Sequence, residues 1–173
     1  MAAVSPRPEE ILLPARRGFV LLTLVAAFAF NVLPFDGLAL ALRPDLVALT
    51  ILYWCLHDPR RFGIGSAWIV GLISDVAAGT LFGEHALAYS VIAFLGMVLR
   101  RRVLGFGLSG QMLHVAPILL VGKLVLVVVA LAGGAAFPGW PLLAAPLLGT
   151  LLWPVLSVLY LIPRKPGRGG DEL

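Results

Sequence analysis

The sequence predicts an all-α membrane protein in which six apolar helices cross the bilayer as one bundle. Hydrophobic residues make up 60% of the 173 residues and charged residues only 13%, and the mean hydropathy is +1.00. Soluble domains carry about 25% charged residues, so this composition is typical of an integral membrane protein. The charges that do occur are grouped between apolar runs, which favours several separate spans.

Six apolar runs give the order of the predicted spans. They cover residues 18–33, 46–56, 62–82, 86–99, 112–131 and 141–162. A membrane domain is therefore predicted over residues 18–162, with cytoplasmic tails at 1–17 and 163–173. The first run lacks a small-residue cleavage site at its end, so we expect it to stay in the protein as a helix.

Basic residues are concentrated in every second gap between the runs. The remaining gaps contain only Arg43, and Lys123 falls inside the fifth run. Lys and Arg beside spans are retained on the cytoplasmic face, so the pattern predicts that both termini are cytoplasmic. The clusters lack interleaved aromatic residues, and nucleic acid is therefore not an expected partner, whereas membrane lipid is. The clustered residues are Arg7, Arg16, Arg17, Arg60, Arg61, Arg100, Arg101, Arg102, Arg164, Lys165 and Arg168.

Two runs are shorter than the roughly 20 residues that a helix needs to cross a bilayer. The second run has 11 residues, and we expect its helix to begin at Pro44, because proline suits the first turn and Asp45 would then lie at the positive end of the helix dipole. Residues 38–42 should fold against the bundle or the outer leaflet. The fourth run has 14 residues, and local thinning of the bilayer could accommodate both runs.

The third run carries small residues at a spacing of four. This row includes Gly79 and Gly83, which form a GxxxG element of the kind that lets two helix backbones approach closely in lipid. The row predicts a close helix contact, either within the protein or with another chain. Its members are Gly63, Ala67, Gly71, Asp75, Gly79 and Gly83.

Asp75 is a carboxylate placed near mid-membrane, where a charge costs at least about 2.5 kcal/mol. Lys123 lies at a similar predicted depth, so the leading hypothesis is a structural ion pair between the two. A protonated Asp75 that is hydrogen-bonded to Ser74, Thr80 or the backbone is the second reading. A proton or ion relay is the third.

No catalytic, cofactor or metal site is predicted. The GLSG sequence at 107–110 matches the GxSG of intramembrane serine proteases, in which the serine faces a histidine from a different span. Here the one histidine that follows Ser109 in the sequence is His114, only five residues away, so the match is not expected to be catalytic. His57, His85 and His114 fall at opposite membrane faces and show no metal-ligand spacing with Cys55, so each is expected to be an interfacial histidine. Cys55 lies in an apolar run, where a free thiol packs as a small hydrophobic group.

Several short motifs occur in the first half of the chain: RPDL at 43–46, YW at 53–54, RFGIG at 61–65, GLISD at 71–75 and LFGEHAL at 81–87. Together they resemble the MreD family of rod shape-determining proteins, mainly over residues 43–98. Length, number of spans and basic tails agree with that family over the whole chain.

The resemblance implies a non-enzymatic scaffold in the bacterial inner membrane that belongs to the elongation (rod) complex. Its expected partners are MreC first, then the actin-like MreB, the glycosyltransferase RodA and the transpeptidase partner of RodA, which together direct lateral peptidoglycan synthesis. The family fold is similar to that of the substrate-binding subunits of energy-coupling-factor transporters. That similarity supplies the alternative function, a subunit that captures a small molecule. Pro44, Asp45, Gly71, Asp75, Gly79, Gly83 and Lys123 are the candidate structural or partner-contact residues.

Overall fold

The computed structural model describes residues 16–161 except Pro138, and every regular element in that part of the chain is helical. This confirms the predicted all-α class. Most of the two predicted tails lies outside the described residues. The elements are α1 (Arg17–Val32), α2 (Gly37–Leu42), α3 (Leu46–His57), α4 (Ile64–Ala78), α5 (Glu84–Leu104), α6 (Leu108–Ala132), the 3-10 helix η1 (Trp140–Leu143) and α7 (Ala144–Leu161).

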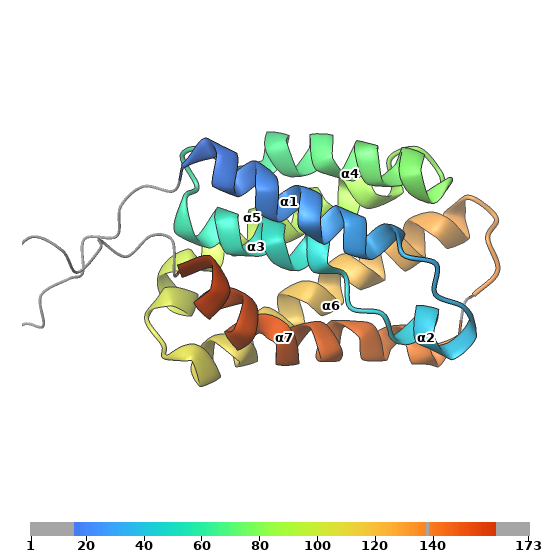
Figure 1. Ribbon diagram of the computed structural model, residues 1–173. Helices are drawn as coiled ribbons and strands as arrows, with labels where there is room; N and C mark the ends of the chain where they lie inside the picture. Colours follow the sequence, from blue (N-terminus) through green and yellow to red (C-terminus); the bar gives the residue numbers. More distant parts are fainter. Residues whose placement is uncertain (1–15, 138, 162–173) are drawn as a thin grey trace, which may run out of the picture.

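The six longer helices run alternately up and down along one bundle, while α2 lies across one end beside η1 and α7 (Figure 1). Helix α3 is the centre of this arrangement, since it packs against α1, α5 and α7. All ten of its residues from Val47 to Leu56 are buried. Residues 38–42 were expected to fold against the bundle or the outer leaflet, and α2 indeed packs on the bundle.

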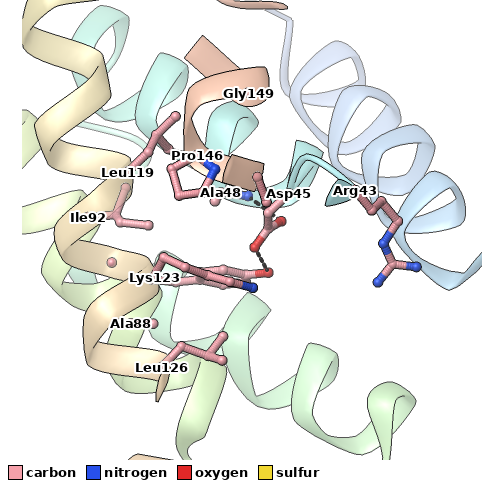
Figure 2. Close-up of a pocket in the computed structure, with 13 residues that line it drawn as sticks. Arg43, Asp45, Ala48, Ala88, Ile92, Leu119, Lys123, Leu126, Pro146 and Gly149 are labelled. Atoms are coloured by element: carbon pink, nitrogen blue, oxygen red, sulfur yellow. Dashed lines mark hydrogen bonds between the residues drawn. The ribbon is translucent and has the colours of Figure 1, made fainter. Parts of the chain in front are cut away.

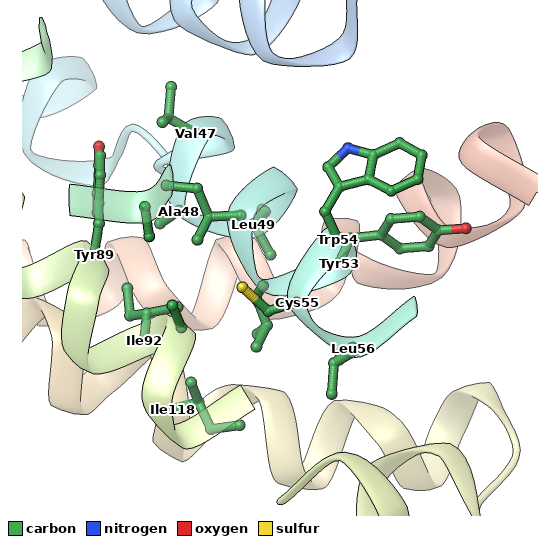
Figure 3. Close-up of a cluster of buried hydrophobic side chains, with 14 of the residues drawn as sticks. Val47, Ala48, Leu49, Tyr53, Trp54, Cys55, Leu56, Tyr89, Ile92 and Ile118 are labelled. Atoms are coloured by element: carbon green, nitrogen blue, oxygen red, sulfur yellow. The ribbon is translucent and has the colours of Figure 1, made fainter. Parts of the chain in front are cut away.

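Aromatic side chains fill the space on one side of α3. Tyr53 and Trp54 extend away from Ile92 of α5, which packs on the other side (Figure 3). Trp54 Nε1 donates to Thr23 Oγ1 of α1 at 3.0 Å, and the hydroxyls of Thr50 and Tyr160 lie 3.0 Å apart. These hydrogen bonds satisfy polar groups that would otherwise be costly to bury. The core around α3 is therefore tied together by side-chain hydrogen bonds as well as by packing.

The outward faces of the helices are also apolar. Val76 of α4, Leu113 of α6 and Val155 of α7 are 71%, 76% and 64% exposed. A soluble protein rarely exposes contiguous apolar surface on this scale, whereas lipid would cover it. By length and composition, Leu108–Ala132 and Trp140–Leu161 can each cross a membrane, and α1, α3 and α4 are apolar but shorter.

Three helix boundaries differ from the sequence-based expectation. Helix α3 begins at Leu46 and not at Pro44, because Asp45 has extended backbone and serves as the N-cap. Helix α5 continues to Leu104 and so includes the Arg100–Arg102 cluster, since arginine is a good helix former. Its apolar stretch is still the 14 residues 86–99, so local thinning of the bilayer stays a prediction there.

The third boundary is the end of α4, which stops at Ala78. The predicted helix over residues 62–82 is therefore too long. Gly79 closes α4 with a φ of 63°, and Gly83 precedes α5 with a φ of 104°. Both values lie in the left-handed region that glycine adopts without strain. These two glycines shape a turn between helices, and the prediction that they form a GxxxG packing face is wrong.

Candidate functional site

Polar side chains gather at the end of the bundle where α3 and α5 begin and α4 ends. Two aspartates, Asp75 and Asp45, are the centres of two hydrogen-bond networks there. Asp75 accepts from the turn and the helix that directly follow it in the sequence, whereas Asp45 accepts from α1, α3 and α5. A cavity beside Asp45 is lined partly by Lys123.

Asp75 ties the end of α4 to the start of α5. Its Oδ2 accepts from Gly83 N at 2.8 Å, and its Oδ1 accepts from His85 N at 2.6 Å. The His85 ring contributes a further contact, with Nδ1 2.9 Å from Oδ1. Asp75 is only 1% exposed. The carboxylate thus satisfies backbone N–H groups at the N-terminus of α5 that have no partner within the helix.

The hypothesis that Asp75 pairs with Lys123 is wrong. Within the described residues, the salt bridges are Arg61–Asp58 and His85–Asp75. The oxygens of Asp75 are occupied by donors from its own helix hairpin, including a longer contact of 3.4 Å from Thr80 Oγ1. The second sequence-based alternative was a protonated Asp75 hydrogen-bonded to Ser74, Thr80 or the backbone. Thr80 and the backbone are indeed partners, but Ser74 donates to Val70 O instead, and in these bonds the Asp75 oxygens are acceptors.

Gly71 lies opposite the start of α5, one helical turn before Asp75. A Cβ atom placed on Gly71 would overlap Ala86 Cα and would lie 2.6 Å from Ala86 N. Real Cβ atoms do not approach backbone so closely, so only glycine fits here. The prediction that Gly71 makes a close helix contact is confirmed, and the partner is α5 of the same chain. The contact also keeps Asp75 within reach of the α5 amides.

Asp45 is the second centre and caps α3. Its Oδ1 accepts from Ala48 N at 3.0 Å, which is the usual N-cap interaction. The same oxygen accepts from Asn31 Nδ2 of α1 at 2.7 Å, and Oδ2 accepts from Tyr89 Oη of α5 at 2.9 Å. Asn31 Oδ1 in turn accepts from Leu46 N at 3.2 Å. Asp45 therefore joins three helices, and Pro44 precedes it in the link from α2.

A cavity of about 350 Å³ opens beside Asp45 and is lined partly by Arg43, Lys123 and His85. Asp45 and Lys123 also line a smaller, mostly apolar cavity of about 30 Å³ between α3, α5, α6 and α7. Lys123 reaches across that space toward Asp45, whereas Arg43 points away from it (Figure 2). The Arg43 side chain donates to Leu33 O at 3.2 Å.

Lys123 makes no hydrogen bond or salt bridge within residues 16–161, leaving aside Pro138. Both oxygens of Asp45 are already occupied by other donors. Helix α6 thus places the amino group of Lys123 in the cavity near Asp45 and not near Asp75.

The arrangement of Asp75, His85 and Thr80 does not match a catalytic triad. Asp75 Oδ1 and Thr80 Oγ1 both face the same ring nitrogen, Nδ1, at 2.9 and 3.5 Å. A catalytic triad needs the carboxylate on one ring nitrogen and the hydroxyl on the other. Among the described residues there is also no group of three His, Cys, Asp or Glu side chains that could hold a metal ion.

Three residues of these networks were missed or undervalued from the sequence: Asn31, His85 and Tyr89. His85 was interpreted as an interfacial histidine. Asn31 lies inside a run of apolar residues, and an amide in such a position has to find a polar partner. That signal could have identified Asn31, but no periodic pattern identifies its partner on another helix.

Comparison with known proteins gives a consistent result. The sequence model of the family described as rod shape-determining protein MreD matches residues 16–162. The rod shape-determining protein MreD of Haemophilus influenzae is 30% identical over 139 residues, which cover 78% of this chain and 83% of that protein. No solved structure matches the chain. The expected likeness to energy-coupling-factor subunits therefore stays a prediction.

Proposed function

We propose that this chain, which belongs to the family of the rod shape-determining protein MreD, is a non-enzymatic membrane scaffold subunit of the bacterial elongation complex. The observation that carries this proposal is the family match over residues 16–162, which includes both aspartate networks. The proposed location is the bacterial inner membrane, with six spans and both termini in the cytoplasm. MreC is the first proposed partner, and MreB, RodA and the transpeptidase partner of RodA complete the assembly.

The use of the polar side chains supports a scaffold. Asp75 bonds backbone amides at the start of α5, and Asp45 bonds α1, α3 and α5. Groups committed to holding helices together are not available for proton transfer or nucleophilic attack. The seven candidate residues named from the sequence are accordingly proposed to act through the shape of the bundle, with Lys123 facing the cavity.

Affinity purification tests this proposal directly. The tagged full-length chain would be extracted from membranes in mild detergent, and the co-purified proteins would be identified by mass spectrometry. Recovery of MreC together with RodA supports the scaffold. Recovery of a pair of ATPases without MreC would contradict it and would support the alternative, a substrate-binding subunit of an energy-coupling-factor-type transporter.

A matched pair of variants makes the purification sharper. Gly71→Leu should disturb the α4–α5 hairpin, while Gly65→Leu adds the same bulk on the same helix at a position with no atom within 4 Å. We expect Gly65→Leu to keep the partners of the wild-type chain and Gly71→Leu to lose them. Equal recovery by both variants would mean that partner binding does not depend on this hairpin.

A further inference from the structure

Another cavity lies at the opposite end of the bundle from the aspartate networks, where α1 and α4 begin side by side (Figure 1). It is a groove of about 500 Å³ between these two helices. Val20, Leu21 and Leu24 of α1 form one wall, and Ile69 and Val70 of α4 form the other. Leu21 and Ile69 are 63% and 56% exposed. The walls are thus apolar and open to the surroundings.

One end of this groove is strongly basic. Arg17 from the first turn of α1 and the pair Arg60 and Arg61 from the α3–α4 link all line it. The acidic residue in the lining is Asp58, which lies 3.7 Å from Arg61 Nε. Among the described residues that line the groove, three arginines and one aspartate leave an excess of positive charge next to an apolar channel.

The two helix N-termini at this end add to the positive potential. Neither α1 nor α4 has a side-chain cap hydrogen bond or an acidic residue in its first turn. Uncapped N-termini carry partial positive charge and exposed N–H donors, which favour a phosphate. The groove therefore combines arginine side chains, helix dipoles and an apolar channel, which match a phosphate and a hydrocarbon chain in the order found in a phospholipid.

We propose that the groove between α1 and α4 binds one anionic phospholipid, with its phosphate at Arg17, Arg60 and Arg61 and one acyl chain between Leu21 and Ile69. Charge complementarity identifies the occupant, because a zwitterionic lipid would offer the arginines no net charge. A basic pocket between membrane helices is a known way to hold an anionic headgroup. The proposal concerns a lipid site and does not depend on the identity of the protein partners.

Native mass spectrometry of the purified full-length chain tests the headgroup. The chain would be titrated with phosphatidylglycerol and, separately, with phosphatidylcholine of the same chain length. We expect one phosphatidylglycerol to bind at least tenfold more tightly than phosphatidylcholine. Arg17→Gln combined with Arg60→Gln should weaken phosphatidylglycerol binding roughly 25-fold, at about fivefold per arginine. Arg101→Gln combined with Arg102→Gln removes the same charge from exposed positions on α5 and should change binding less than threefold.

The acyl-chain channel needs a separate test. Ile69→Trp should fill the groove and weaken phosphatidylglycerol binding, whereas Val76→Trp, at an exposed position on α4 outside the groove, should not. Glycerol 3-phosphate carries the phosphate without chains, and an excess of it should fail to displace the lipid. Equal weakening by both arginine pairs, equal affinity for the two lipids, or an unaffected Ile69→Trp variant would each overturn the proposal.

Discussion

Asp75→Leu should destabilise the protein strongly, because the carboxylate is the hydrogen-bond acceptor for the start of α5. Leucine would leave Gly83 N and His85 N, now bonded at 2.8 and 2.6 Å, without an acceptor in a buried site. Each stranded donor costs about 1–3 kcal/mol, so the expected loss is about 2–6 kcal/mol of unfolding free energy. Asp75→Asn keeps one oxygen acceptor, and its loss should be about half as large.

Reversible unfolding in mixed micelles, followed by fluorescence of the buried Trp54 and Trp153, measures these free energies. Asp36→Leu is the matched control, since Asp36 is exposed and its side chain makes no cap hydrogen bond; its change should stay within about 0.5 kcal/mol. An Asp75→Leu protein as stable as the control would refute the network. The losses of unfolding free energy in Asp75→Leu and in Lys123→Met should add in the double variant to within about 0.5 kcal/mol. A coupling energy above about 1 kcal/mol between the two changes would support the ion pair rejected above.

Three further outcomes are expected. Gly71→Leu should lower the unfolding free energy by about 1–3 kcal/mol or more through overpacking, and Gly65→Leu should not; equal losses would exclude the close contact with Ala86. Tyr89→Phe should cost about 1.5–3 kcal/mol because its hydroxyl bonds a carboxylate, against about 0.5–1.5 kcal/mol for Tyr160→Phe, whose partner is the neutral Thr50; the reverse order in the same unfolding assay would contradict the role of Asp45. In a Cys55→Ala background, single cysteines at positions 37 and 137 should react with an impermeant reagent added to intact cells, and those at 8 and 168 should be protected; labelling at 8 or 168 would overturn the proposed topology.

Hydropathy located the helices well because charged residues or Gly and Pro mark the ends of the apolar runs. The run at 18–33 differs by one residue at each end from α1 (Arg17–Val32). The run at 46–56 differs by one residue, at its C-terminal end, from α3 (Leu46–His57). The run at 86–99 underestimates α5, since Arg100–Arg102 end the apolar segment without ending the helix. A hydropathy boundary marks a change of solvent preference, whereas a helix ends where its backbone changes conformation.

The site was less predictable than the fold. Spacing four placed Gly71, Gly79 and Gly83 in one row, but only Gly71 is inside α4, because the other two have left-handed backbone. The similar predicted depths of Asp75 and Lys123 in the membrane suggested that the two side chains meet. Depth in the membrane, however, does not determine which faces of two helices point toward each other. The main donors to Asp75 lie eight and ten residues away, in the following turn and at the start of α5. Lys123 lies near Asp45 because α3 and α6 both pack against α5.

Depletion of the chain in its own rod-shaped host tests the central claim most directly. Cell width and length would be measured by microscopy as the protein is depleted, with uptake of a labelled vitamin followed in the same cultures. The scaffold account predicts that cells widen and become round while uptake is unchanged, and that Gly65→Leu but not Gly71→Leu restores the rod. Cells that remain rod-shaped after depletion while vitamin uptake falls would contradict it.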